Sequence, residues 1–136
     1  MFAKSKFLMV MLLGFFAYSC SSHDFSRPEE AMKSFYYAIA NKDAELYAKS
    51  FYEQGQFTAG EIRLGAQYIF AHFKTLKYEI IQKQSVGPDK VQFTMEEVLE
   101  KDNGMKFVSK FIVTYVKAGK EWKILNTQDI ETRKID

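Results

Sequence analysis

The sequence predicts an α+β fold in which N-terminal helices pack on a strongly curved, four-stranded antiparallel sheet. Two observations carry this prediction. Apolar residues recur every three or four positions from about residue 28 to residue 75, which is typical of amphipathic helices. From residue 76 to residue 125 they alternate instead, and turn residues interrupt the alternation. Helices followed by closely spaced strands are typical of a fold with its helices on one face of a sheet.

The first predicted helix begins after Ser26. Ser26 and Glu29 have the spacing of a capping box, and Pro28 suits the first turn of a helix, where its missing N–H costs nothing. The helix should run to about Asn41. Its apolar stripe comprises Met32, Phe35, Tyr36 and Ile39.

Two further helices are predicted. Asp43 can cap a second helix, which Gly55 ends. Thr58 and Glu61 repeat the capping-box spacing at the start of a third helix, which should reach about Thr75. The second helix would form a tight hairpin with the first.

Three turns divide the second half of the chain into four strands. The turns fall at residues 87–89, 101–104 and 118–120, which contain Gly, Pro, Asn or Asp. Ile81 breaks the alternation of the first strand, as a bulge would. Residues 107–116 form the most β-branched and aromatic run, so we expect this strand to lie centrally in the sheet.

The N-terminal stretch has the order of a secretion signal. Basic residues precede an apolar run at residues 7–16, and small residues precede Cys20. The run is shorter than the roughly 20 apolar residues that span a bilayer. Residues 17–20 resemble the bacterial lipobox, in which the cysteine thiol is lipidated and becomes the mature N-terminus. The alternatives are an ordinary cleaved signal peptide that leaves Cys20 as a free thiol, and a buried apolar helix.

Lipidation would give the single cysteine a role. A lone cysteine in an exported chain has no intramolecular disulfide partner, and several acyl chains on one residue anchor a protein stably. The sequence therefore predicts a membrane partner through lipidated Cys20, and a bacterial cell envelope location. Ser21, rather than aspartate, after the cysteine favours the outer membrane. Asp24 alone gives weak support for display at the cell surface.

These readings divide the chain into four parts. Residues 1–19 are the predicted lipoprotein signal peptide, 20–26 a polar tether, 27–128 one α+β domain, and 129–136 a polar tail.

Charge and motifs argue against several classes of protein. The chain has 19 basic and 17 acidic residues, but Lys4 and Lys6 would leave with the signal, so the remainder is neutral. Its lysines are interspersed with acidic residues, which argues against nucleic-acid binding. We found no Cys-based metal motif and no Gly-rich phosphate loop, so no metal or cofactor is predicted.

The pattern resembles the nuclear transport factor 2-like superfamily, also described as cystatin-like, and in particular its bacterial lipoproteins of unknown function. The shared features are an acid-rich capped helix, a break at residues 41–43, a short second helix, and a last hairpin with the sequence GKEWKI. The resemblance covers residues 26–126. It implies a cone, in which a bent sheet wraps around the helices, with a cavity that relatives use for ligands or for catalysis.

No residue is assigned a catalytic role. The resemblance implies acid–base pairs inside the cone for isomerases and dehydratases of the superfamily. The candidates are His72 and four tyrosines, Tyr36, Tyr47, Tyr78 and Tyr115. The other histidine, His23, falls in the tether and so does not pair with His72. A lone histidine near a helix C-terminus is more often a partner of the helix dipole than a base. Glu96, Glu97 and Glu100 suggest the wet face of an edge strand rather than a cation site.

The aromatic residues suggest a second use of the cone. Most of the 13 Phe, 8 Tyr and one Trp are expected to be core. A further hypothesis is that seven of them line an apolar pocket with hydroxyls at its rim. These are Tyr36, Tyr47, Phe70, Tyr78, Phe111, Tyr115 and Trp122.

Two functions remain. The favoured one is a non-enzymatic, lipid-anchored binding or interaction module of the envelope, with a small apolar ligand or an envelope protein as its partner. The alternative is a small acid–base enzyme, of isomerase or dehydratase type, with its site inside the cone. An enzyme needs at least two titratable side chains converging deep in a pocket, whereas a binding module can be purely apolar.

Overall fold

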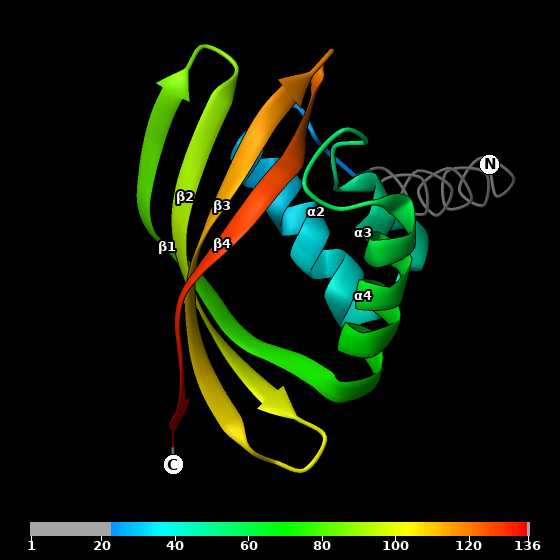
Figure 1. Ribbon diagram of the computed structural model, residues 1–136, viewed down its shortest axis with the longest axis vertical. Coiled ribbons are helices and arrows are strands. Elements are labelled where there is room, and N and C mark those ends of the chain that lie inside the picture. The colour runs from blue at the N-terminus through cyan, green and yellow to red at the C-terminus, as the bar shows by residue number, and fades with distance from the viewer. Residues whose placement is uncertain (1–22, 136) are drawn as a thin grey trace, which may run out of the picture.

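The computed structural model describes residues 23–135 and confirms the predicted α+β class (Figure 1). In chain order the elements are α2 (Pro28–Asn41), α3 (Ala44–Lys49), α4 (Ala59–His72), β1 (Phe73–Gly87), β2 (Lys90–Lys101), β3 (Lys106–Ala118) and β4 (Glu121–Ile135). The predicted signal peptide and Cys20 lie outside the described residues. Among residues 23–135, no helix is both long enough and apolar enough to cross a membrane.

The four strands form one antiparallel sheet in the order β1-β2-β3-β4, and the helices cover one of its faces (Figure 1). β3 is an interior strand, as its composition predicted. The turns lie where the sequence places them. Gly104 and Gly119 have φ angles of 86° and 68°, a region that favours glycine.

Bulges bend β1 around the helices. The register between β1 and β2 shifts three times, and the residues skipped are Leu76, Ile81 and Val86. The bulge predicted at Ile81 is therefore confirmed. Each skipped residue leaves the alternation of the strand, and all three have exposed side chains. Bulges also twist an edge strand away from further pairing.

Side-chain caps fix two of the three helices. The Thr58 hydroxyl accepts a hydrogen bond from the Glu61 amide at 3.1 Å, and the Glu61 carboxylate accepts one from the Thr58 amide at 2.8 Å. The predicted capping box is confirmed. Asp43 caps α3 by accepting a hydrogen bond from the Leu46 amide at 3.0 Å.

The capping box predicted at Ser26 does not form. Arg27 is the N-cap residue of α2, and its side chain makes no capping hydrogen bond. The Ser26 amide donates to the Asp24 carboxylate at 2.8 Å. Glu29 instead accepts a hydrogen bond from Lys83 on β1 at 2.6 Å. Ser26 lies one residue too early, because Pro28 occupies the first turn.

The second helix is shorter than predicted because the residues after it dock on β4. α3 ends at Lys49, well before Gly55. The Tyr52 amide donates to the Ile124 carbonyl at 2.9 Å, and the Gln56 amide donates to the Leu125 carbonyl at 2.8 Å. A Cβ on Gly55 would lie 2.7 Å from the Leu125 carbonyl oxygen, so no side chain fits there. The third helix likewise ends at His72, a few residues before the predicted boundary.

The last strand continues beyond its predicted end. Residues 129–135, which we expected to form a polar tail, are the second half of β4. Their partners lie on β3, down to the pair of Ile135 with Lys106. The side chains here are mostly exposed, which is why the segment resembles a tail in sequence.

The end of the predicted tether belongs to the fold. Phe25 is only 2% exposed, and its carbonyl accepts a hydrogen bond from the Trp122 amide at 2.8 Å. The ammonium groups of Lys49 and Lys123 lie 5.2 and 4.7 Å from the centre of its ring, in cation–π geometry. The His23 ring lies against Tyr37, with centroids 4.6 Å apart. Residues 23 and 25, which we assigned to the tether, therefore pack on the fold.

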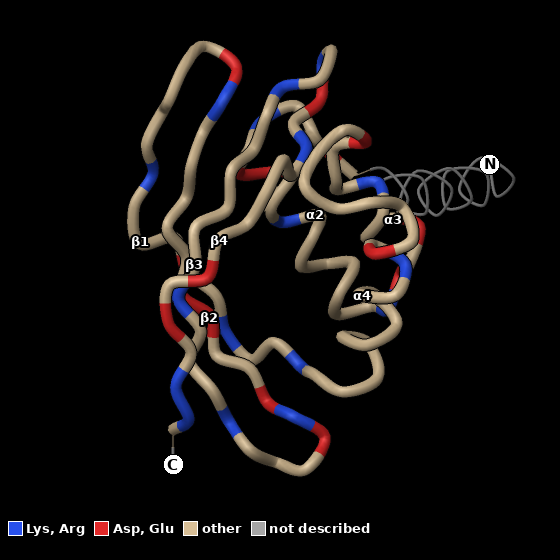
Figure 2. Tube along the Cα trace, in the orientation of Figure 1, with Lys and Arg blue, Asp and Glu red and all other residues tan. Residues whose placement is uncertain are grey.

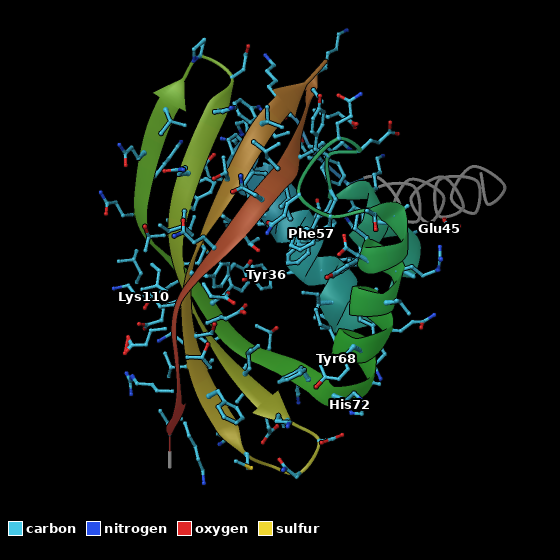
Figure 3. The ribbon with its side chains drawn as sticks, viewed as in Figure 1. Tyr36, Glu45, Phe57, Tyr68, His72 and Lys110 are labelled. Carbon is cyan, nitrogen blue, oxygen red and sulfur yellow. The ribbon has the colours of Figure 1, made fainter. Side chains whose placement is uncertain are left out.

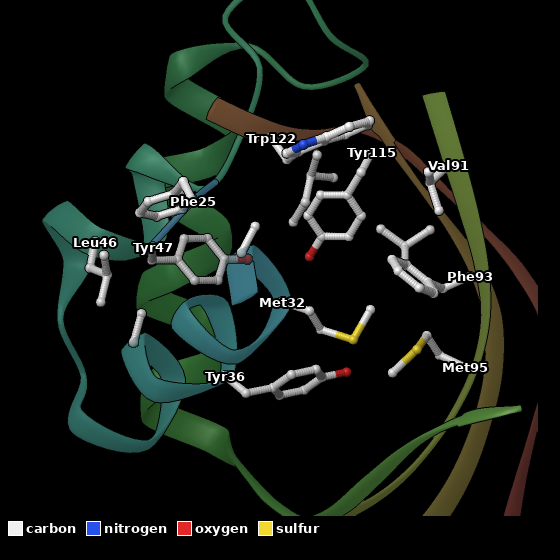
Figure 4. Close-up of a cluster of buried hydrophobic side chains, with 14 of the residues drawn as sticks. Phe25, Met32, Tyr36, Leu46, Tyr47, Val91, Phe93, Met95, Tyr115 and Trp122 are labelled. Atoms are coloured by element: carbon white, nitrogen blue, oxygen red, sulfur yellow. The ribbon is translucent and has the colours of Figure 1, made fainter. Parts of the chain in front are cut away.

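The hydrophobic core lies between the helices and the inner face of the sheet (Figure 4). Phe93 and Met95 on β2 and Tyr115 on β3 are its most buried large side chains. Met32 of α2 faces them across the core (Figure 4). The core therefore holds the helices to the middle strands.

Candidate functional site

An apolar cavity of about 330 Å³ lies between the helices and the inner face of the sheet. This volume is at the lower end of the roughly 300–1,000 Å³ that small-molecule sites occupy. Aromatic and aliphatic side chains from α2, α3, α4 and all four strands line most of it. Its polar groups are few, and two of them are the carboxylates of Glu97 and Asp129.

One hydrogen bond joins two polar side chains that line the cavity. The Tyr36 hydroxyl, from α2, donates to a carboxylate oxygen of Glu97, on β2, at 2.7 Å. The Tyr36 ring stacks on that of Tyr78, with centroids 3.8 Å apart and planes 9° from parallel. Tyr78 is in turn the β1 partner of Glu97 in the sheet register. Three elements therefore hold this pair in place, and Figure 3 shows Tyr36 between the helices and the sheet.

The cavity disfavours charge on these groups. Burial raises the pKa of Glu97 and the nearby Asp129 raises it further, while the hydrogen bond from Tyr36 opposes both. Burial and the neighbouring Glu97 also raise the pKa of Tyr36 well above its ordinary range, so the hydroxyl stays a neutral donor. Burial, with a contribution from Glu97, raises the pKa of Tyr47 to about 12. Glu97 therefore keeps its proton to a higher pH than an exposed glutamate does.

The structure places the seven predicted pocket residues in three groups. Tyr36, Tyr47, Phe111 and Tyr115 line the cavity. Phe70 and Tyr78 line an adjoining groove. Trp122 lines neither hollow; it is 9% exposed and lies at the opposite end of the core cluster from Tyr36 (Figure 4).

The prediction for the three glutamates of β2 is wrong about the edge strand, and wrong about the outer face for Glu97 alone. β2 lies between β1 and β3, so it is not an edge strand. Glu97 faces the cavity, while alternation places Glu96 and Glu100 on the opposite face of the strand. The sequence did carry the signal, because Glu97 continues the inward series of Val91, Phe93 and Met95. Asp129 was missed because it falls in the predicted tail.

A groove of about 910 Å³ adjoins the cavity. The ends of α2 and α4, the start of β1 and the hairpin between β2 and β3 enclose it. Tyr36, Ile39, Phe73 and Thr75 line both the groove and the cavity, so the two hollows meet there.

His72 lies at the rim of this groove, as the last residue of α4 (Figure 3). Its Nδ1 is 2.7 Å from a carboxylate oxygen of Asp102, and its carbonyl accepts a hydrogen bond from the Asp102 amide at 3.0 Å. Both side chains are about half exposed, at 44% and 53%. The pair fastens the β2–β3 hairpin to α4. Within residues 23–135, no cluster of His, Cys, Asp and Glu suits a metal ion.

No protein-family model and no curated protein matches this sequence. Solved structures with a similar fold include a ketosteroid isomerase-like protein from Erwinia carotovora atroseptica, at 14% identity and a TM-score of 0.60, covering 79% of this chain and 93% of that one. An NTF2-like protein from Cytophaga hutchinsonii is similar at 10% identity and a TM-score of 0.59, covering 74% and 91%. A computationally designed 17-OHP binder is similar at 13% identity and a TM-score of 0.59, covering 78% and 95%.

These likenesses establish the class of fold. The described residues share the α+β fold of solved structures that include NTF2-like, ketosteroid isomerase-like and cystatin-like proteins, which is the fold that the sequence resemblance predicted.

Replacing Glu97 by glutamine should stabilise the protein at neutral pH. Because the pKa of Glu97 is raised from 4.5 in the fold, its contribution to stability is full below about pH 4.5 and is lost as the pH rises through the raised value. Glutamine stays neutral, and its amide oxygen can still accept the hydrogen bond from Tyr36. We expect Glu97→Gln to raise the free energy of unfolding in urea by about 1 kcal/mol at neutral pH, with little change near pH 4.

Glu96→Gln is the matched control, because Glu96 is the neighbouring residue on the opposite face of β2. This variant should leave the pH dependence of the unfolding free energy as it is. A loss of stability in Glu97→Gln at neutral pH would mean that the ionised carboxylate stabilises the fold, and would contradict this prediction.

Proposed function

We propose that this protein is a lipid-anchored binding module of the bacterial cell envelope, which holds a small, largely apolar molecule in the cavity. One observation carries the proposal: an apolar cavity of about 330 Å³ contains a single hydrogen-bonded polar pair, Tyr36 with Glu97. Apolar walls favour a water-insoluble molecule, and a few fixed polar groups orient it. The fold shared with a designed 17-OHP binder supports this use of the cone.

The binding test uses the full-length chain in membranes and a neutral probe, a dodecanol analogue with a photoreactive diazirine near its methyl end. Illumination should attach the probe to peptides that contain cavity residues such as Met95 and Phe111. Thr75→Trp places a bulky ring where the cavity meets the groove, and a tryptophan is well tolerated in a strand. We expect this variant to reduce cavity labelling to the level of an unilluminated sample.

Thr94→Trp is the matched control, since Thr94 alternates with Phe93 and Met95 and so faces away from the cavity. Labelling of the cavity peptides should persist in this variant. Equal labelling of the two tryptophan variants, or labelling confined to surface peptides, would show that the cavity is not the binding site.

The anchoring is tested separately. In bacteria that make the full-length chain and are fed an alkyne analogue of palmitate, we expect the protein to incorporate the label and Cys20→Ala to lose it. Ser22→Ala, two residues away, should remain labelled. Ser21→Asp should move the protein from the outer to the inner membrane fraction. Labelled Cys20→Ala would refute lipidation at this residue.

A second candidate function is a small acid–base enzyme. The observation that favours it is that two carboxylates line the same cavity: Glu97, which is partly buried, and Asp129, whose side chain is exposed. A carboxylic acid with a raised pKa can serve as a general acid or as a base near neutral pH. The fold shared with a ketosteroid isomerase-like protein supports this candidate.

The two candidates differ in proton transfer. An enzyme of this kind should speed the exchange of α hydrogens of an apolar cyclic ketone for deuterium in D₂O, as followed by NMR. Glu97→Gln should abolish that acceleration, whereas a binding module shows no acceleration with either chain.

A further inference from the structure

We propose that the groove beside the cavity binds the anionic head group of a single-chain amphiphile, whose apolar chain lies in the cavity. This inference rests on the proposed binding function and names the class of ligand for it. It follows from the continuity of the two hollows, from the charge at the groove, and from an unusual backbone conformation at one of its lysines.

The two hollows form one path with two different linings. Tyr36, Ile39, Phe73 and Thr75 belong to both. The apolar lining continues into the groove through Phe70, Leu76 and Tyr78. The hydrocarbon chain of a ligand that extends from the cavity would therefore still contact apolar side chains. A molecule that fills both must be elongated and apolar over most of its length.

Positive charge gathers at the groove and not at the cavity. Four lysines line the groove: Lys42 at the end of α2, Lys74 and Lys77 at the start of β1, and Lys101 at the end of β2. Lys101 shares the face of its partner Phe73, which lines the cavity, whereas Lys74 and Lys77 lie on the other face of the strand, with Glu100 and Val98 as their partners. None of the four takes part in an ion pair within residues 23–135. The charged groups opposing them are Glu100 and Asp102, and Asp102 is held by His72.

This excess contrasts with the rest of the chain. Acidic and basic residues are interspersed over the fold, with basic segments at the start of β1 (Figure 2). The cavity itself contains two carboxylates and no lysine. The groove therefore attracts an anion, whereas the apolar cavity disfavours any charge, and this difference fixes the direction in which an amphiphile binds.

Lys42 gives an independent indication. It adopts the left-handed conformation, with φ 54° and ψ 43°, and no other residue besides glycine does so between positions 23 and 135. Glycine is the usual residue at this position of a helix end, because a side chain is strained there. The lysine at this position lines the groove.

The test compares two photoreactive probes of equal chain length on the full-length chain in membranes: dodecanoate, which is anionic, and dodecanol, which is neutral. Both carry the diazirine near the methyl end. At low salt we expect dodecanoate to label the cavity peptides about fivefold more efficiently than dodecanol. Dodecyl phosphate as a competitor distinguishes a phosphate from a carboxylate head group, because the preferred head group competes more strongly.

Lys42→Gln/Lys101→Gln should remove the preference and bring the two probes to equal labelling. Lys101 is the register partner of the cavity residue Phe73, and Lys42 lines the groove at the end of α2. Lys117→Gln/Lys120→Gln is the matched control, since these lysines are exposed near the turn between β3 and β4. High salt should weaken the preference in the native chain.

The outcomes separate this inference from the function on which it rests. If both probes label the cavity equally and the lysine substitutions change nothing, the proposal of an anionic head group is wrong. The proposed binding function would still hold. If Lys117→Gln/Lys120→Gln also removes the preference, the preference reflects the net charge of the protein, and the proposal that the head group binds in the groove is wrong. Absence of cavity labelling with either probe overturns both.

Discussion

Replacing Phe93 by alanine is expected to lower the free energy of unfolding by about 3 to 5 kcal/mol. Phe93 lies on the interior strand β2 with 0% of its surface exposed. Its ring meets that of Tyr115 edge to face, with centroids 5.8 Å apart. Domains of this size are typically stable by only about 5 to 15 kcal/mol, so the variant would lose much of its stability. Urea unfolding followed by Trp122 fluorescence measures the loss.

Leu64→Ala is the control for this prediction. Leu64 lies on α4 and is 64% exposed, so its truncation should change the unfolding free energy by less than about 0.5 kcal/mol. If the two variants were equally stable, the core would not be centred on β2.

The second large effect is expected at Phe25. Phe25→Ala removes a buried ring that two ammonium groups cover, and should cost about 3 kcal/mol. The hydrogen bond from the Trp122 amide is made by the main chain, so it does not depend on the side chain. Loss of this magnitude is unusual for a residue that precedes the first helix. Urea unfolding followed by circular dichroism measures it.

Phe25→Leu separates packing from the cation–π contacts. Leucine keeps most of the apolar volume, so this variant should recover all but about 1 kcal/mol of the loss, which is the share of the two ammonium groups. A Phe25→Ala variant as stable as the native chain would show that the segment before α2 does not dock on the fold.

Much of the fold follows from local patterns in the sequence. The alternation of Val91, Phe93 and Met95 predicts both a strand and its buried face, because side chains of a strand point alternately to its two sides. The spacing of Thr58 and Glu61 predicts the start of α4 because the capping box is a contact between near neighbours. Neither inference needs information about distant parts of the chain.

The polar groups of the site are brought together by contacts between distant parts of the chain, and the sequence patterns did not predict most of them. Tyr36 and Glu97 are 61 residues apart, and their contact requires that α2 cross the inner face of β2. Asp129 reaches the cavity only because β4 continues beside β3 into a segment with the composition of a tail. Phe25 was assigned to the tether because one aromatic residue among polar ones has no periodicity to indicate burial.

The docking of Phe25 limits how far the domain could stand from a membrane. With Cys20 lipidated as we propose, only Ser21 and Ser22 separate the acylated residue from His23, which contacts the fold. Three residue steps span at most about 10 Å, so the linker between Cys20 and His23 is comparable in length to the Debye length of about 8 Å at physiological salt. Lys49 and Lys123, beside Phe25, would then face the lipid head groups. α2 is 14 residues long and therefore extends for about 20 Å from the end near Phe25. Lys42 follows its other end, so the groove that Lys42 lines would lie on the side away from the bilayer.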